Sequence, residues 1–182
     1  MKLRQHLLAG IALLLFSYNL LLAQTNSSAA AYDTDLLVEE LFELAPQNAR
    51  ITKEFVADAS FLTLDRTTLR KLNMERPDRW LLQIPTESGE MLELDLAQSQ
   101  PLSDDFYVTN QDDEPIDYKP GLYYHGYLKS DPSSMVALSL FDSQVHAVFA
   151  VKGHTWVLGH LGQDKFPAGD DYILYNSKNL LV

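Results

Sequence analysis

The chain has 182 residues and no cysteine, and its 25 acidic residues outnumber its 14 basic residues, which gives a formal charge of -11 at pH 7. The length fits one ordinary domain with appendages, and 46% hydrophobic residues are typical of a globular chain and not of a disordered one. The missing cysteine excludes disulfides, thiolate metal ligands and cysteine nucleophiles, and the acidic balance argues against a nucleic-acid partner, which needs a basic face.

An export signal is predicted over residues 1–23. Two basic residues, Lys2 and Arg4, precede an almost wholly apolar stretch from Leu7 to Leu22, and Ala23 offers a cleavage site before a polar run. This layout is typical of a secretory signal peptide, and the stretch is near the lower length limit for a membrane-spanning helix. We therefore favour removal over retention and expect a secreted or periplasmic protein without a stable membrane anchor after cleavage. The remaining chain carries 12 basic and 25 acidic residues, a charge of -13.

Residues 24–79 are predicted to form a leader and a short helical segment. Leucines near helical spacing, with acidic residues between them, predict an amphipathic helix from Asp33 to Leu44, closed by Pro46. A second short helix is predicted over 64–72, with Asp65 as its N-cap.

A β domain is predicted over residues 80–182, because the hydrophobic period changes to two at Trp80. Apolar and polar residues alternate on both sides of a turn within 80–96, which indicates a hairpin with one buried and one wet face. Residues 99–121 are rich in proline and acidic residues and are predicted to be a loop, with a short strand at 106–108.

The last third of the chain carries the clearest β pattern, a meander of antiparallel strands. Both faces of the strand 144–151 are largely apolar, so we expect it to be covered on both sides. Gly126 between aromatic residues predicts a bulge or a close backbone approach. The predicted fold class is mainly β, an antiparallel β-sandwich or half-barrel with a C-terminal meander and one or two short N-terminal helices. The strands are expected at 123–128, 135–141, 144–151, 154–161 and 172–175, with tight turns at Asp142–Ser143 and Lys152–Gly153.

This meander resembles the propeptide of reprolysin-type (adamalysin-type) secreted zinc metalloproteases. That family shows a Tyr-x-Gly strand, a small-residue turn around a serine and a Val-Ala-Leu-Ser strand, which look like Tyr124–Leu128 and Asp131–Leu140 here. An aromatic strand and a terminal Ile-x-Tyr segment follow in the family, and they look like Trp156–Leu158 and Ile173–Tyr175. The resemblance covers roughly residues 80–176. It implies a non-catalytic domain that helps a metalloprotease catalytic domain to fold, in cis or in trans, and inhibits it sterically.

Two features depart from that family. Its propeptides often place a cysteine on the active-site zinc, and this chain has none, so inhibition would depend on shape or on an oxygen or nitrogen ligand. The motif H-E-x-x-H is absent from the sequence, so we expect no enzyme activity. The apolar end Asn179–Val182 favours a truncated or fragmentary precursor, and export without cysteine favours a bacterial relative. The alternative is a stand-alone extracytoplasmic β-module with a binding or structural role.

Histidines are the first candidates for chemistry. His154 and His160 would lie about 20 Å apart on one strand, at about 3.3 Å per residue, so they cannot share one ion. A metal site would need His125 or His146 from a neighbouring strand and a third ligand, and His6 lies in the predicted signal. We expect ordinary strand histidines, with no metal site and no cofactor.

Carboxylate clusters are the second candidates. They lie at Asp104–Asp105, Asp112–Glu114 and Asp170–Asp171. Calcium binding and glycoside hydrolysis are both conceivable for such groups, but charge runs usually face water, which is the reading we favour. A small hydrolase using Asp112, Asp113 or Asp170 is the third hypothesis. Ser133 and Ser134 lack the G-x-S-x-G context of a nucleophile, so no catalytic residue is assigned.

Overall fold

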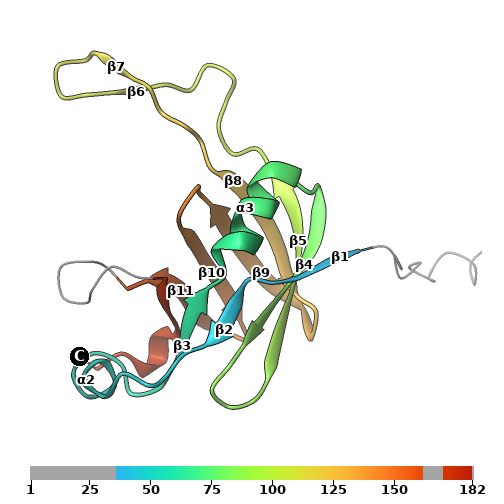
Figure 1. The fold of residues 1–182 in the computed structure, drawn as a ribbon, viewed down its shortest axis with the longest axis vertical. Helices are drawn as coiled ribbons and strands as arrows, with labels where there is room; N and C mark the ends of the chain where they lie inside the picture. Colours follow the sequence, from blue (N-terminus) through green and yellow to red (C-terminus); the bar gives the residue numbers. More distant parts are fainter. Residues whose placement is uncertain (1–35, 162–169, 182) are drawn as a thin grey trace, which may run out of the picture. The chain divides into compact units, whose positions relative to one another are not determined.

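A ten-stranded β-sheet, rolled into a nearly closed barrel, forms the centre of the protein (Figure 1). The computed structural model describes residues 36–161 and 170–181. The sheet order is β1-β4-β5-β8-β9-β10-β11-β12-β3-β2, and all neighbours are antiparallel except β1 and β4. The strands are β1 (Leu37–Glu40), β2 (Phe42–Leu44), β3 (Ala59–Leu64), β4 (Arg79–Pro85), β5 (Met91–Ser99), β8 (Leu122–Leu128), β9 (Asp131–Leu140), β10 (Val145–Val151), β11 (His154–His160) and β12 (Asp171–Asn176).

The two ends of the sheet are joined by continuous chain. β1 pairs with β4 at one end and β2 pairs with β3 at the other, while only Leu41 separates β1 from β2. Leu41 is fully buried, and its carbonyl oxygen accepts a hydrogen bond of 3.0 Å from the N–H of Asp65. This connection brings the two sheet ends together and limits the unpaired edge that could attract another chain.

The helix predicted from Asp33 to Leu44 is wrong, because residues 37–44 form β1 and β2. The leucine spacing fits a helix, but burial alternates along β1, and Val38 and Leu44 are about half exposed. β4 and β3 would otherwise be the outermost strands, and each takes a partner from this segment. Hydrogen bonding to the backbones of β4 and β3 therefore outweighs the weak local preference of this segment for a helix.

Alternate residues of the strands point inward and fill the barrel with apolar side chains, as expected for a small barrel. The bulkiest of them are Trp80, Tyr124, Phe149 and Tyr172, and all four are almost completely buried. The rings of Trp80 and Tyr124 meet edge to face with centroids 5.7 Å apart. The predicted hairpin over 80–96 is confirmed by β4 and β5, which pair antiparallel across a turn.

Helix α3 (Arg66–Glu75) covers one end of the barrel and confirms the second predicted helix (Figure 1). Its N-cap is Asp65, as predicted, and the carboxylate accepts a hydrogen bond of 2.8 Å from the N–H of Thr67. Leu69 and Leu72 are buried in the barrel core. Because α3 leads from the end of β3 to the start of β4, it lies at the end of the barrel opposite to the start of β3 and the end of β4.

A smaller apolar cluster lies on the outer face of β3 and β12. There Ile51 of helix α2 (Ala49–Glu54) packs with Phe61 and Ile173. A short 3-10 helix, η1 (Ser177–Asn179), follows β12. Strands β1, β2 and β3 and helices α2 and α3 thus come from residues 24–79, expected to be a leader and a short helical segment, and the compact unit that contains the barrel begins at Leu36.

The predicted C-terminal meander is confirmed by β8 to β12, but the prediction that β10 is covered on both sides is wrong. Val145, Ala147 and Phe149 point into the barrel and are buried, whereas His146 and Val148 point outward and are exposed. In a barrel, only one face of each strand points into the core. The apolar residues on the other face of β10 therefore contact solvent, although the sequence pattern fits a strand that is buried on both faces.

Among the described residues, no helix combines the length and the apolar character that crossing a bilayer requires. The predicted signal peptide, residues 1–23, lies outside the described part of the chain.

Candidate functional site

The connection between β5 and β8 projects from the barrel end that α3 covers (Figure 1). We call residues 100–121 the arm. Its tip is a two-stranded ribbon of β6 (Val108–Thr109) and β7 (Pro115–Ile116). Asn110 orders the turn, because its Oδ1 accepts hydrogen bonds of 2.9 Å from the N–H groups of both Asp112 and Glu114. The predicted loop therefore carries an ordered ribbon, and the predicted strand at 106–108 is reduced to its last residue.

The base of the arm is tied to the barrel. Lys119 Nζ lies 2.7 Å from a carboxylate oxygen of Asp142, and the hydroxyls of Tyr118 and Tyr123 are 3.3 Å apart. The hydrogen bond with Tyr123 raises the pKa of Tyr118 above its ordinary value. Gly121 lies so close to β9 that a Cβ there would be 2.6 Å from a main-chain carbonyl oxygen. These contacts set the direction in which the arm leaves the barrel.

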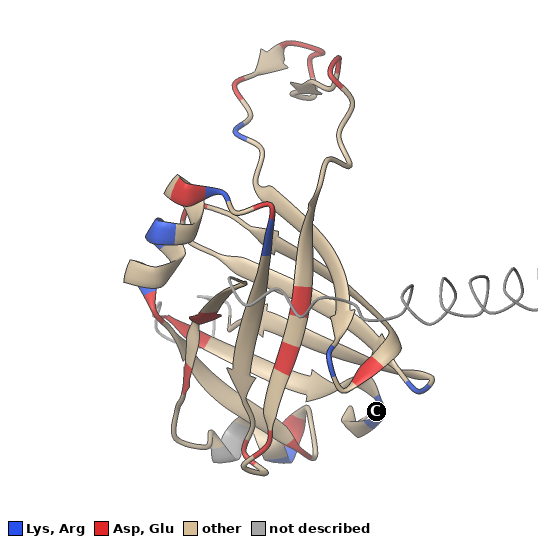
Figure 2. Cartoon of the chain, turned by 90° about the vertical axis from the view of Figure 1, so that its right-hand side faces the viewer, with Lys and Arg blue, Asp and Glu red and all other residues tan. Residues whose placement is uncertain are grey.

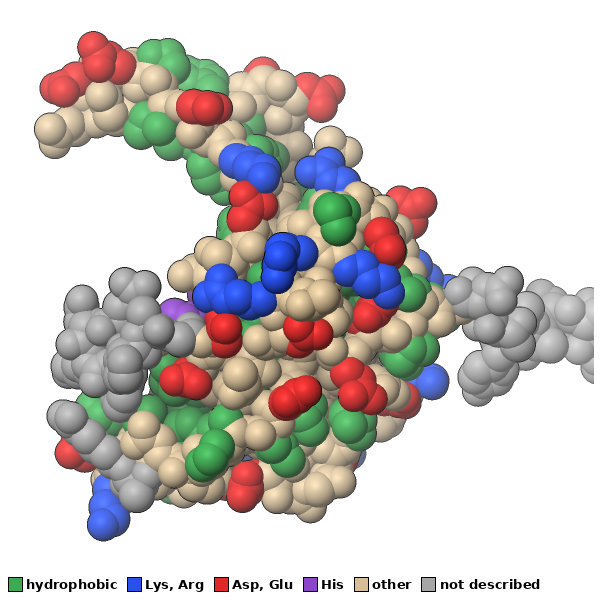
Figure 3. All heavy atoms as spheres, viewed as in Figure 1, with side chains coloured by type: hydrophobic (Ala, Val, Ile, Leu, Met, Phe, Trp, Pro, Cys, Tyr) green, Lys and Arg blue, Asp and Glu red, His purple; other side chains and the backbone are tan. Residues whose placement is uncertain are grey.

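The arm exposes apolar side chains among carboxylates. Phe106, Tyr107, Ile116 and Tyr118 are between 40% and 75% exposed, and the rings of Phe106 and Tyr118 pack edge to face at 5.8 Å. Six acidic residues and one lysine lie in the same stretch. Figure 2 shows acidic residues at the tip of the arm, and Figure 3 shows apolar side chains along the arm beside them. Exposed aromatic residues gathered on one projection are typical of a protein-binding surface.

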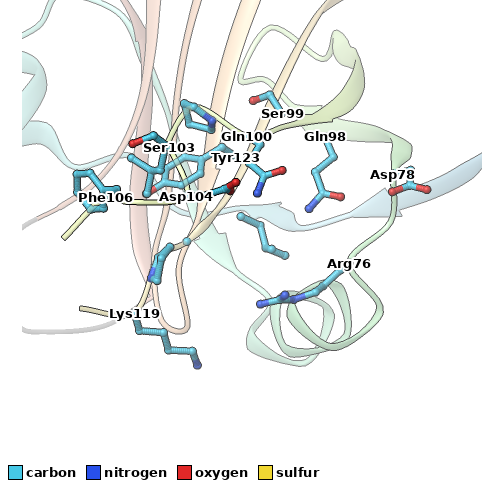
Figure 4. Close-up of a pocket in the computed structure, with 15 residues that line it drawn as sticks. Arg76, Asp78, Gln98, Ser99, Gln100, Ser103, Asp104, Phe106, Lys119 and Tyr123 are labelled. Carbon is cyan, nitrogen blue, oxygen red and sulfur yellow. The ribbon is translucent and has the colours of Figure 1, made fainter. Parts of the chain in front are cut away.

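A cleft of about 710 Å³ lies where the base of the arm, the end of β5 and the end of α3 meet. Figure 4 shows the amide side chains of Gln98 and Gln100 and the carboxylate of Asp104 around this space, with Arg76 reaching it from α3. Phe106 adds an apolar surface at the arm side. The volume lies within the range of ordinary ligand pockets.

The lining of this cleft suits a polypeptide segment. Arg76 and Lys119 contribute positive charge, and Asp78 and Asp104 contribute negative charge, so neither sign dominates. Amide and hydroxyl side chains both donate and accept hydrogen bonds, as the main chain of an extended peptide requires. The cleft and the exposed face of the arm share Phe106, so one partner can contact both.

No protein-family model matches this chain, and a comparison with characterised proteins finds no match either.

The structure separates the predicted histidine candidates. His125, His146 and His154 are exposed on three different strands, and His160 is half-buried beside the ring of Tyr172 at 5.2 Å. Partial loss of water around the imidazole, together with the charge of His160, lowers the pKa of His146. Within residues 36–161 and 170–181, no group of three His, Cys, Asp or Glu side chains is placed to hold a metal ion. His6 lies outside the described residues.

The carboxylate candidates fall in two places. Asp104–Asp105 and Asp112–Glu114 belong to the arm, where a hydrogen bond from the side chain of Ser103 lowers the pKa of Asp105. Asp170 lies directly before β12, which begins at Asp171, and its Oδ1 is 2.5 Å from Nε of Arg66. The residues of the hydrolase hypothesis therefore lie on separate elements, the turn of the arm and the barrel.

Ser134 stabilises a turn of the barrel through its hydroxyl group. Its hydroxyl donates to the carbonyl oxygen of Asp131 at 2.6 Å and accepts from the N–H of Leu128 at 2.7 Å, which holds the turn between β8 and β9.

Of the residues of the cleft, sequence reasoning named Asp104 as a candidate and missed the others. Gln98, Gln100, Arg76 and Tyr123 come from the end of β5, the end of α3 and β8, and no local pattern links them. The one available signal was the polar run Gln98–Gln100 at the end of a strand whose other residues alternate.

Proposed function

We propose that this chain is a non-catalytic, propeptide-like domain of a secreted zinc metalloprotease, which helps a catalytic domain to fold and covers it sterically. Two features support this role. The meander resembles reprolysin-type propeptides, and the arm exposes apolar side chains among carboxylates. The partner is the catalytic domain, in cis or in trans.

The exposed apolar surface of the arm is the main support for this proposal. A projection that exposes four large apolar side chains to water is unfavourable for an isolated domain and favourable when a partner buries them. Aromatic anchors of this kind supply much of the affinity of protein interfaces. The surrounding carboxylates fit a partner surface that carries basic residues around an apolar groove.

The cleft at the base of the arm supports the same role. Without cysteine, the domain must cover a catalytic domain by shape and by hydrogen bonds from oxygen and nitrogen groups. The mixed lining around Gln98 and Gln100 offers such groups to an extended segment of the partner. The short ribbon of the arm also has open edges, to which a partner strand can pair.

The test is inhibition of a protease by the full chain in trans. The purified chain is titrated against the reprolysin-type catalytic domains encoded in the same genome, with cleavage of a fluorogenic peptide as the measurement. We expect half-inhibition of one of them at micromolar concentration. Tyr107→Ser and Phe106→Ser should each weaken inhibition at least about tenfold, because they remove exposed aromatic anchors.

The matched control is Met135→Ser, which alters a side chain that is 71% exposed on the barrel wall, away from the arm. It should change inhibition by less than about twofold, since most surface contacts outside the anchors contribute little. No inhibition of any of these catalytic domains at about 100 μM, which exceeds the affinity of a functional inhibitor, would contradict the proposal.

A stand-alone extracytoplasmic binding module is the second candidate function. The observation that favours it is a second cavity, at the end of the barrel opposite to the arm, where β3 begins and β4 turns into β5. This module would bind its ligand with or without a protease.

A further inference from the structure

One side of the barrel has an outer surface without charge. Strands β8, β9, β10 and β11 are neighbours in the sheet (Figure 1), and their outward side chains line up in rows across the four strands. The middle stretch of each strand contains no Asp, Glu, Lys or Arg. We call this surface the uncharged wall, and it consists of the outward side chains of residues 123–125, 135–139, 146–150 and 155–157.

The uncharged wall is exposed to solvent and has a smooth centre. Val148 lies in its middle row and is 48% exposed, and it is paired with Ala137 on β9 and Val157 on β11. Ala137 is exposed as well, and Met135 at one side of the wall is 71% exposed. Because the central side chains are small, a second sheet can pack face to face on this surface, at the usual spacing of about 10 Å.

The neighbouring side of the barrel is charged, which marks the limit of the uncharged wall. Arg79 on β4 and Asp95 on β5 form an ion pair of 2.8 Å, and Lys129 lies 3.5 Å from Glu93. Both pairs lie at the outer surface, next to β8. Since depletion of charged residues at an exposed surface is the compositional mark of an interface core, the uncharged wall has the character of a contact surface.

The charge of the whole chain indicates which partner fits this surface. The formal charge is -11 at pH 7, so two copies of the chain repel each other wherever their carboxylates meet. A basic partner would gain most from the acidic parts of the surface and nothing electrostatic from the uncharged wall. A second copy of this chain, by contrast, can approach closely only through a surface that lacks carboxylates.

The size of the uncharged wall sets the strength of such contact. Four strands at about 4.8 Å spacing and about 20 Å of strand length cover roughly 400 Å² in projection. The relief of the side chains raises the accessible area above this value, but a standard interface buries about 800 Å² on each partner. The wall therefore suits a weak and reversible dimer.

We propose that this chain forms a weak two-fold dimer in which the uncharged walls of two copies pack face to face. A two-fold interface uses the same patch on both copies, so residues near its centre meet their own counterparts. Val148 has this central position. The wall contains no residue of the arm, so the dimer does not rest on the propeptide role.

The first measurement is the mass of the chain in solution as a function of its concentration. The chain is produced by export, so that the predicted signal peptide is processed as in the cell, and is studied at pH 8 by sedimentation equilibrium from about 5 μM to about 1 mM. We expect a monomer–dimer equilibrium with a dissociation constant below about 300 μM, as for a small interface. The dimer should be at least about threefold tighter in 500 mM than in 50 mM NaCl, because salt screens the repulsion between two acidic copies.

Val148→Lys tests the position of the interface. Two lysines would meet near the two-fold axis, so the dissociation constant should rise at least about tenfold. Val38→Lys is the matched control, because Val38 is 50% exposed, lies on β1 outside the wall, and gives the same net charge when replaced. It should dimerise as the wild type does. Circular dichroism confirms that each variant is folded, and Ala137→Lys is the substitute if Val148→Lys is not.

Four results would overturn the proposal. A chain that stays monomeric up to about 1 mM has no such dimer. A dimer that weakens as salt is added, or that the two lysine variants affect equally, is not formed by the uncharged wall. Loss of the dimer in Tyr107→Ser would assign the contact to the arm. A monomeric chain whose Val148→Lys variant fails to inhibit a catalytic domain would assign the wall to that partner.

Discussion

Gly126 occupies a position on β8 that admits no side chain, as the predicted close approach requires. A Cβ there would lie 1.9 Å from the main-chain carbonyl oxygen of Asp95 on β5, an atom that cannot rotate away. The pairing of β8 with β9 is also irregular between Gly126 and Leu128. A bulge and close strand contact thus coincide at one residue.

Gly126→Ala should therefore lower the free energy of unfolding by more than about 3 kcal/mol, because two backbones must separate. Urea denaturation measures the change. Gly159→Ala on β11 is the control, since nothing lies within 4 Å of a Cβ built there, and it should change stability by less than about 1 kcal/mol. Similar losses in the two variants would show that the contact with β5 is not the cause.

Asp95 is a buried carboxylate on the outer face of β5. Nε and Nη2 of Arg79 donate to it at 2.9 Å and 2.8 Å, and the hydroxyl of Tyr127 donates at 3.0 Å. These hydrogen bonds, with those of Arg79 the strongest, hold the pKa of Asp95 below its usual value. A depressed pKa stabilises the folded state above the unfolded-state pKa of about 3.9, and this stabilisation is lost as the pH falls through the folded-state value.

Asp95→Asn should cost about 1–2 kcal/mol of unfolding free energy at pH 7, a moderate value because Arg79 is half exposed and water screens the pair. The difference from the wild type should shrink as the pH is lowered below about 4. Urea denaturation across this pH range measures it. Asp142→Asn, whose ion pair with Lys119 is exposed, should change stability little at either pH. A loss that stays constant with pH would contradict this account.

Among the elements, β2 shows how the barrel is closed. It is three residues long, yet it provides the last strand of the sheet, and Leu41 immediately before it is fully buried where the two sheet ends meet. Lys71 of α3 also forms an ion pair with Glu39 of β1, so the helix is attached to the segment that joins the two sheet ends. The closure thus depends on a few well-buried contacts.

Leu41→Ala should lower the free energy of unfolding by about 3 kcal/mol, because it leaves a cavity at the junction. Leu44→Ala, at the end of the same short strand, is the control, since Leu44 is 47% exposed and its truncation should cost less than about 1 kcal/mol. Thermal or urea unfolding compares the two. If the two leucines prove equally important, the junction is not the point of closure.

In the molecule as a whole, the barrel and the arm are largely separate. The ribbon of the arm forms its own two-stranded sheet, and its large side chains are exposed, whereas β5 and β8 pair with each other directly. In the described part of the chain, the contacts that hold the arm to the barrel lie at the base of the arm, so we expect the barrel to keep its core without the arm.

Replacement of residues 103–118 by a short Gly-Ser linker should leave the barrel folded, with a melting temperature within about 5 °C of the wild type. Circular dichroism during heating measures this, and the same variant should no longer inhibit a catalytic domain. Loss of the folded barrel would show that the arm is part of its core.

Much of the architecture was predictable from local signals. Asp65 caps α3 because a carboxylate can accept from nearby N–H groups, and Lys152 and Gly153 form a tight turn in which both have positive φ. Apart from Asp104, which its acidic cluster singled out, the residues of the cleft and of the second cavity were not predictable, because each set comes from several strands and no local pattern links them.

The sequence by itself determined the barrel strands from Trp80 onward, their tight turns and helix α3, since the period of two and the capping residue act between near neighbours. Only the tertiary structure decided that residues 37–44 are strands, that the sheet nearly closes, and that each of its two ends carries a cavity. These features depend on which strands lack a partner and on contacts between residues far apart in the chain, and local preference yields to them.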